Sequence, residues 1–205
     1  GVLVQEPEDV FSILDRGEVP VVIDPRGECI GRLKPDVVID GILAKKNLGT
    51  HRGMAPLTIA LGPGFCAGED VDVVIETKRG HNLGRVIREG RAIPNTGIPG
   101  NIGGYTAQRV LHASEDGVLK TIRKIGDLVK QGEPIAEIWT KEGKALVEAS
   151  LDGIIRGLIR DGFSVTKGFK IADIDPRREE LENCFTISDK ARCIGGSVLE
   201  VVCSY

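Results

Sequence analysis

Acidic residues and a glycine-rich turn close several short apolar runs in the first half of the chain. Asp24, Asp40 and Glu76 each end such a run, and a Gly-Pro-Gly turn at 62–64 ends another. Carboxylates can act as general acids or bases, and glycines let backbone N–H groups come close to an anion. If the runs are parallel strands, their carboxyl ends meet at one edge of a sheet, where open α/β sheets bind ligands. A ligand site is therefore expected at that edge.

Basic and polar residues that follow these runs complete the predicted site. Each has an ordinary alternative role, because a Gly-Pro-Gly sequence is often only a tight turn and a Lys-Lys pair suits the end of a helix. Their meeting at one edge, rather than any one of them, supports a binding site. The residues expected to bind the ligand are Lys45, Lys46, Asn47, Gly62, Pro63, Gly64, Phe65, Glu76, His81, Asn95, Thr96 and Gly97. The sequence identifies no catalytic residue.

The cysteines and histidines do not predict a metal site. The five cysteines are scattered without a CxxC pair, and the three histidines are not spaced as metal ligands. We expect free thiols in a reducing cytoplasm. Cys66 lies in a glycine-rich turn, but a catalytic thiol needs a base such as His51 or His81, and no spacing requires one.

Composition argues against two classes of partner. The formal net charge of −3 at pH 7 does not suit binding of nucleic acid through bulk charge. No apolar run approaches the ~20 residues that span a bilayer, so a membrane is not an expected partner either. With 205 residues, the chain can bury one good core or two small ones.

The apolar runs that precede the acidic residues predict β-strands. They are continuous in Val and Ile, without alternation, as in strands buried on both faces of a parallel sheet. Together with intervening helices, they predict a small, partial Rossmann-like parallel α/β domain over 1–92. The expected strands cover 19–24, 36–40, 57–62 and 71–76, and the expected helices cover 7–16, 41–47 and 81–89.

The second half contains an internal repeat. Residues 113–138 align without gaps to residues 149–174, with the shared pattern A-S-x-D-G, a short β run, G-x-x-V-x-x-G and I-A-x-I. Short strands between fixed glycines predict two interlocked copies that form one small barrel over 111–176. The whole chain is therefore expected to be α/β plus all-β.

The repeat resembles the biotinyl/lipoyl carrier fold, a barrel-sandwich hybrid with similar Asp-Gly and glycine turns. Carriers present a modified lysine at the hairpin between the two halves, which here is residues 139–148. The position of that lysine falls on Glu142, between Lys141 and Lys144. The resemblance therefore implies a carrier-like barrel without biotin or lipoate attachment, in a structural or partner-binding role.

Two further segments connect and close these domains. The stretch 93–105, IPNTGIPGNIGGY, has no charge and places apolar residues between its turns, so 93–110 is expected to be an ordered connector that forms one wall of the site. Residues 177–205 are expected to pack back on the first domain, or on a second subunit, through a helix over 189–202. The pair Gly195-Gly196 lowers helix stability by ~1 kcal/mol per glycine relative to Ala. This cost suggests a close approach to a neighbouring backbone, or a helix boundary.

Taken together, several long motifs resemble one family, the selenium-dependent molybdenum hydroxylase system proteins of the YqeB type. These motifs are LKPDVVIDGILAKKNLGT (33–50), MAPLTIALGPGFCAG (54–68), VIETKRGHNLGRVIREGRAIPNTGIPGNIGGY (74–105) and FTISDKARCIGGSVLE (185–200). The resemblance implies an accessory or maturation protein for a selenium-dependent molybdenum hydroxylase. It also implies that the chain lacks the family's amino-terminal segment with a nucleotide-type glycine turn.

Three functions follow from these observations. The first is the accessory protein, which would bind an anionic cofactor, a nucleotide or a molybdopterin-type ligand, and a partner from the molybdenum hydroxylase or its maturation machinery. The second is an enzyme that acts on a small molecule with Asp24, Asp40 or Glu76 as acid–base groups. The third is a purely structural interaction module. A cytoplasmic location is expected, and a homo-oligomer stays open.

Overall fold

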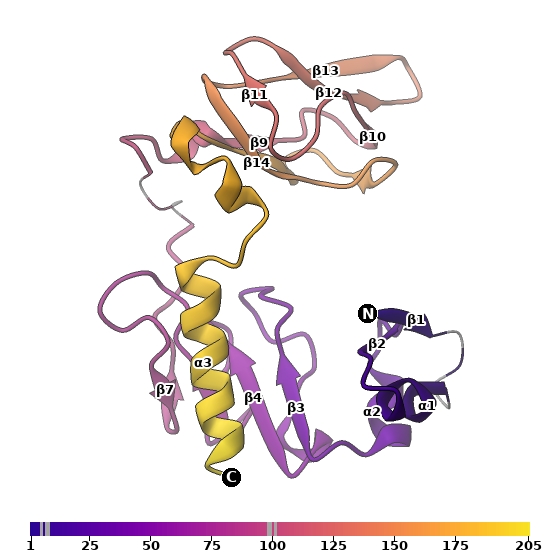
Figure 1. Ribbon diagram of the computed structural model, residues 1–205, viewed down its shortest axis with the longest axis vertical. Coiled ribbons are helices and arrows are strands. Elements are labelled where there is room, and N and C mark those ends of the chain that lie inside the picture. Colours follow the sequence, from indigo (N-terminus) through magenta and orange to yellow (C-terminus); the bar gives the residue numbers. More distant parts are fainter. Residues whose placement is uncertain (5, 7–8, 98–99, 101) are drawn as a thin grey trace. The chain divides into compact units, whose positions relative to one another are not determined.

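The computed structural model describes residues 1–4, 6, 9–97, 100 and 102–205 (Figure 1). The chain divides into two compact units. Unit 1 comprises Gly1–Asn95 together with Lys190–Tyr205, and unit 2 comprises Thr96–Asp189. Residues 7 and 8 of the expected first helix, and residues 98, 99 and 101 of the expected connector, lie outside the described residues.

A four-stranded mixed sheet forms the centre of unit 1. Its order is β3 (Val37–Asp40), β4 (Leu57–Leu61), β6 (Val73–Ile75) and β7 (Val86–Ile87). The first three strands are parallel, and β7 pairs antiparallel with β6. These strands occupy the Val- and Ile-rich runs of the sequence. All of β6 and nearly all of β4 are buried, so apolar residues are favoured on both faces of these strands.

One helix covers one face of this sheet. The helix α3 (Asp189–Cys203) packs Ile194 and Val201 against Ile59 and Ile75 (Figure 1). The neighbouring Ala60 belongs to a separate cluster, as expected for adjacent strand residues that point to opposite faces. That second cluster includes side chains from β5 (Cys66–Ala67), which pairs with β8 (Gly90–Arg91).

The expected Rossmann-like architecture is wrong for the central sheet of unit 1, because no α-helix lies between β3 and β4 or between β4 and β6 in the described residues. The segment expected as a helix at 41–47 is a loop, in which Leu43 and Lys45 have positive φ angles of 58° and 63°. The segment expected as a helix at 81–89 is a turn followed by β7, whose pairing with β6 overrides the helical spacing of its apolar residues. The long helix on the sheet comes from the end of the chain instead.

The glycines of α3 do not serve a close approach. A Cβ atom added to Gly195 or Gly196 would meet no atom within 4 Å, so the expectation of backbone contact there is wrong. The glycine that allows α3 to approach closely is Gly84, in the turn before β7, where an added Cβ would lie 2.6 Å from Cys193 Sγ of the helix. Leu199, expected on the apolar stripe, is 62% exposed.

The beginning of unit 1 is a small βαβα segment. It consists of β1 (Val2–Val4), α1 (Asp9–Asp15), β2 (Pro20–Val22) and α2 (Glu28–Leu33), and β1 and β2 are parallel. The helix and the strand expected at 7–16 and 19–24 correspond to α1 and β2. Val4, Val10 and Ile13 form a buried cluster of their own.

Unit 2 consists of two four-stranded antiparallel sheets around one core. The first has the order β13 (Lys144–Glu148), β12 (Pro134–Trp139), β10 (Gly117–Thr121), β15 (Ser164–Val165). The second has the order β11 (Leu128–Val129), β14 (Gly153–Leu158), β16 (Lys170–Asp175), β9 (Val110–His112). Short 3-10 helices complete the chain: Arg52–Met54 in unit 1, and Ala107–Arg109, Arg178–Glu180 and Glu182–Cys184 in unit 2.

The sequence repeat is visible in this arrangement. Each copy gives its two long strands to one sheet and its short middle strand to the other, so the copies exchange β11 and β15. Gly117 and Gly153 are equivalent residues, and a Cβ on either would collide with a backbone carbonyl, that of Trp139 or Asp175 respectively. The repeated glycine is thus required by close strand packing.

The described end of the expected connector is folded onto unit 2. Ile102 and Tyr105 exchange backbone hydrogen bonds across a short turn. The buried guanidinium of Arg109 donates to Asp173 and to the carbonyl of Gly100.

Candidate functional site

The carboxyl edge of the parallel strands is built by two buried acidic residues, each of which closes a loop. Asp40, at the end of β3, is 7% exposed. Its Oδ1 accepts the N–H of Ile42 at 3.0 Å, and its Oδ2 accepts the hydroxyl of Thr50 at 2.6 Å. Asp40 therefore holds both ends of the loop 41–50.

Glu76 likewise holds the backbone that follows β6. It is 2% exposed, its Oε1 accepts the N–H of Lys78 at 2.7 Å, and its Oε2 accepts the N–H of Ile93 at 2.7 Å. The segment that contains Ile93 is thereby fixed beside the end of β6. Because both oxygens accept backbone N–H groups, Glu76 positions this part of the backbone.

The loop 41–50 touches the Gly-Pro-Gly turn that follows β4. A Cβ on Gly64, whose φ is +112°, would lie 2.6 Å from the Cα of Lys46, so only glycine allows this contact. Lys45 has the left-handed backbone, which is uncommon for a non-glycine residue and often marks a functional position. Asn47 hydrogen-bonds within the loop, to Gly49 and Thr50.

These loops line an open pocket of about 700 Å³. Its lining consists of Lys45, Pro63, Gly64, Arg91, Ala92, Ile93, Pro94 and Asn95. Among the described residues, this lining carries two cationic side chains, four apolar ones and no carboxylate. A site with this balance suits a small organic anion.

Lys190, on the first turn of α3, is affected by the charge of Lys45, which lines the pocket. Burial lowers the pKa of the Lys190 amine; the charge of Arg79 lowers it further, Glu76 opposes the shift and Lys45 adds to it. Lys190 is therefore close enough to these three groups to be affected by their charges. It belongs to unit 1.

The structure brings together some of the expected site residues and separates others. Four of them line the pocket: Lys45, Pro63, Gly64 and Asn95. Lys46, Asn47, Gly62 and Glu76 shape the surrounding loops. Phe65 is buried in the core, His81 is exposed on a turn and outside the lining of this pocket, and Thr96 and Gly97 belong to unit 2.

Sequence reasoning missed Arg91 and Lys190. Arg91 follows the segment that was mistaken for a helix, and Lys190 is more than a hundred residues away from the strands it approaches. The one available signal was at the amino-terminal end of the predicted tail helix, where a lysine in the first turn is disfavoured by the helix dipole.

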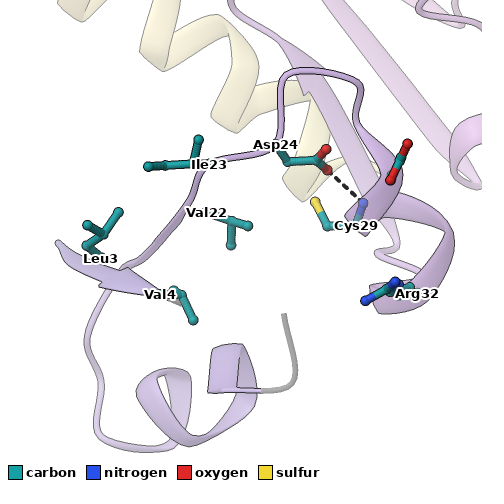
Figure 2. A pocket seen from close by; sticks show the side chains of 8 residues that line it. Leu3, Val4, Val22, Ile23, Asp24, Cys29 and Arg32 are labelled. Atoms are coloured by element: carbon teal, nitrogen blue, oxygen red, sulfur yellow. Dashed lines mark hydrogen bonds between the residues drawn. The ribbon is translucent and has the colours of Figure 1, made fainter. Parts of the chain in front are cut away.

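Asp24 does not join the other carboxylates but lines a smaller pocket of about 240 Å³ in the first segment (Figure 2). Its Oδ2 accepts the N–H of Cys29 at 2.7 Å. Hydrogen bonds from the side chain and backbone of Cys29 lower the pKa of Asp24 to about 2, and the same side-chain contact raises the pKa of the Cys29 thiol. The rest of the lining includes Glu28, Arg32 and apolar side chains from β1 and β2.

The nucleophile hypothesis for Cys66 is not supported by its surroundings. Burial raises the pKa of its thiol; the charge of Arg91 opposes this, and Glu69 adds to it. A thiol in this state is a poor nucleophile. The described residues contain no group of three or more His, Cys, Asp and Glu side chains that could hold a metal, and no described helix is long and apolar enough to cross a membrane.

Comparison with known proteins bears on this site in a limited way. No family model matches the sequence. The chain is 52% identical, over 195 residues, to the uncharacterized protein YqeB of Escherichia coli K12. The resemblance to the YqeB type is confirmed. The aligned region covers 95% of this chain and 35% of the relative, so the chain spans about a third of that protein's length.

Solved structures show only partial likeness. Succinylglutamate desuccinylase/aspartoacylase proteins from Shewanella amazonensis and Rhodobacter sphaeroides match with TM-scores of 0.31 and 0.29 and identities of 20% and 23%. They cover 34% and 33% of this chain, and the chain covers 20% and 22% of them. A succinylglutamate desuccinylase from Silicibacter matches with a TM-score of 0.28 and 16% identity, over 58% of this chain and 45% of that one.

These comparisons correct two expectations. The three solved proteins carry the names succinylglutamate desuccinylase or aspartoacylase, and none of them is named as a Rossmann-like protein, a biotinyl/lipoyl carrier or a molybdenum hydroxylase maturation protein. The expected fold class is wrong, because the described part of this chain is mostly sheet with few helices. The expected association with molybdenum hydroxylase maturation and selenium is likewise wrong. The likeness itself is too low to assign an activity.

Proposed function

We propose that unit 1 is the substrate-binding part of a small-molecule enzyme, whose substrate is a small organic anion bound at the carboxyl edge of β3, β4 and β6. The observation that carries this proposal is the lining of the pocket, where Lys45 and Arg91 are the charged side chains among the residues that the structure describes. A nucleotide or molybdopterin-type ligand, which also carries phosphate, stays a prediction for this pocket.

The surrounding loops make the pocket preorganised. Asp40 and Glu76 direct their oxygens to loop N–H groups and to a threonine hydroxyl, so the positions of Lys45 and Ile93 are fixed before a ligand arrives. Preorganised sites lose less conformational entropy on binding. We therefore assign these two carboxylates a positioning role within the enzyme.

The apolar part of the lining favours an organic ligand over an inorganic ion. Pro63, Ala92, Ile93 and Pro94 present carbon surface beside the two cations. A ligand with a carboxylate or phosphate at one end and a short carbon skeleton would satisfy both parts. The apolar part supplies contact area, and the cations fix orientation.

The test is a binding screen with the full chain. Monocarboxylates, dicarboxylates, phosphate esters and nucleotides would be titrated by calorimetry against the wild type, Arg91→Gln and, as a matched control, Lys141→Gln on the exposed hairpin of unit 2. We expect binding of at least one organic anion, a loss of about tenfold in Arg91→Gln because one charge-assisted contact is removed, and no change in the control. Absence of binding to every anion at millimolar concentration would refute the proposal.

Catalysis is tested separately, with the same samples. Each anion that binds would be incubated with the protein and followed by proton NMR. Time-dependent conversion that disappears in Arg91→Gln is expected for an enzyme. Binding without conversion of any such anion would contradict the enzymatic part of the proposal.

A further inference from the structure

A second pocket, the arginine pocket, adjoins the pocket that contains Lys45. Its volume is about 390 Å³, and much of its lining comes from residues 85–89, which include β7. Arg91 and Ile93 line this pocket as well as the Lys45 pocket. The two pockets therefore meet at these two side chains.

An extended segment forms the boundary between the two pockets. Ala92 is buried at 4% exposure, whereas Arg91 before it and Ile93 after it are exposed. Side chains alternate along an extended backbone, so Arg91 and Ile93 lie on the same outer side of the segment. The N–H of Ile93 donates to Glu76 at 2.7 Å, which fixes the segment in place. One ligand can thus extend from one pocket into the other across a guanidinium and a carbon surface.

The arginine pocket is rich in positive charge. Arg85 and Arg88 flank β7 and are exposed, and neither forms an ion pair within the part of the chain that the structure describes. Arg85 donates one long hydrogen bond of 3.3 Å to the side chain of Asn82. The lining also contains Glu76, whose two oxygens accept backbone N–H groups, and the exposed Glu89. With the arginine that both pockets share, three guanidinium groups line a pocket with two carboxylates.

The side chains of the arginine pocket suit a carboxylate or a phosphate. The planar donors of a guanidinium pair with two oxygens at once in a fixed geometry. Val86 and Ile87, which lie between the two flanking arginines in the sequence, add carbon surface to the lining. The arginine pocket thus repeats the combination found in the Lys45 pocket, cations beside apolar side chains, and it can hold a second anionic group of the same organic molecule.

We propose that the substrate is an elongated organic molecule with an anionic group at each end, and that it spans both pockets. One group binds in the Lys45 pocket, the other binds Arg85 and Arg88, and the carbon skeleton crosses Ile93. This inference rests on the proposed function, because it assumes that the Lys45 pocket binds an organic anion. It adds the separation of the charges on the substrate and two binding residues on either side of β7.

The experiment compares six-carbon ligands that differ in the number of anionic groups. Hexanoate has one, and adipate and fructose 1,6-bisphosphate have one at each end. Each would be titrated by calorimetry, at fixed ionic strength, into the full chain as wild type, Arg88→Gln and Glu89→Gln. The matched control is Arg26→Gln, because Arg26 is an exposed arginine of the same unit that lies outside the lining of both pockets.

We expect adipate or fructose 1,6-bisphosphate to bind the wild type about tenfold more tightly than hexanoate. Arg88→Gln should lose this preference and keep the affinity for hexanoate, because the Lys45 pocket is unchanged. Glu89→Gln should raise the preference about threefold, because it removes a negative charge from the arginine pocket. Arg26→Gln should behave as the wild type. The ratio of the affinities for adipate and fructose 1,6-bisphosphate shows whether carboxylates or phosphates are preferred.

The two proposals fail in different ways. Equal affinity for hexanoate and both longer anions, a preference that persists in Arg88→Gln, or a lower preference in Glu89→Gln overturns the spanning substrate while the proposed function stands. Absence of binding by all three ligands and by the wider anion screen overturns the proposed function as well. Arg88 is exposed, so its replacement leaves the fold intact, and Arg85→Gln on the other side of β7 provides an independent second variant.

Discussion

The replacement Glu76→Gln tests whether a buried carboxylate holds the carboxyl edge together. Glu76 accepts two backbone N–H groups at 2.7 Å, from Lys78 and Ile93. Hydrogen bonds to a charged group contribute about 1.5–3 kcal/mol each. A glutamine keeps one of them in a weaker, neutral form and turns an NH₂ group toward the other N–H. We therefore expect a loss of about 2–4 kcal/mol in the free energy of unfolding of unit 1.

Two probes can follow the two units separately. The single tryptophan, Trp139, lies in unit 2, whereas the longest helix, α3, packs on the sheet of unit 1. Urea unfolding followed by far-UV circular dichroism reports mainly the helix, and tryptophan fluorescence reports unit 2. With a denaturant dependence of about 2 kcal/mol per molar urea, the dichroism midpoint of Glu76→Gln should fall by about 1–2 M. The fluorescence midpoint should stay where it is.

The matched control is Glu69→Gln, on the same unit. Glu69 is exposed and forms a long ion pair of 3.7 Å with Arg91, so its replacement should leave both midpoints unchanged. Hydrogen exchange gives a local readout, since the amide of Ile93 should exchange faster in Glu76→Gln than in Glu69→Gln. Equal dichroism midpoints for the two variants would refute the positioning role of Glu76.

Two further predictions concern stability. In unit 1, Gly84→Ala should be strongly destabilising, because Gly84 has a φ of +80° and an added Cβ would lie 2.6 Å from Cys193 Sγ. Gly195→Ala should instead stabilise α3 by about 1 kcal/mol, because an added Cβ there would meet open space. Similar urea midpoints for both variants would contradict this prediction. In unit 2, burial opposes ionisation of Asp175, but the hydrogen bonds of Arg177 outweigh it and hold its pKa below the usual value. The stabilisation is therefore present at neutral pH and lost as the pH falls below about 4, through the folded-state pKa. Asp175→Asn should lower the fluorescence midpoint at pH 7 and flatten its acid dependence, and an unchanged pH profile would argue against this role.

The parts of the fold that could be predicted are those set by local pattern. The strands at 36–40, 57–62 and 71–76 were predictable because a buried parallel strand needs continuous apolar residues. All three do pair in parallel. The helix of the tail was predictable from apolar residues that recur at helical spacing. In both cases the residues that determine the element lie within it.

The helices expected at 41–47 and 81–89 were wrong for long-range reasons. The first segment is shaped by side-chain bonds of Asp40 and Asn47 and by contact with Gly64, none of which affects helical periodicity. The second has apolar residues that suit a helix, but pairing with β6 satisfies its backbone better. Tertiary contacts overrode propensity in each.

The candidate site divides along the same line. The approach of Lys45 to the Gly-Pro-Gly turn could be predicted, because loops that follow neighbouring parallel strands lie at one edge. The contributions of Arg91 and Lys190 could not, since they depend on β5–β8 pairing and on the docking of α3. Thr96 and Gly97 were expected in the site from sequence adjacency alone, and they belong to the other unit.

The acidic residues of this edge show why residue type alone does not predict the charge of a ligand. Carboxylates at the ends of strands suggest acid–base catalysis or a bound cation. Here Asp40 and Glu76 are buried and directed at loop N–H groups, so their negative charge is used inside the protein. The loops that they hold carry Lys45 and lead to Arg91, which face the pocket. The two buried acids thus hold loops whose cationic side chains line the pocket, and an anion is the ligand that this arrangement favours.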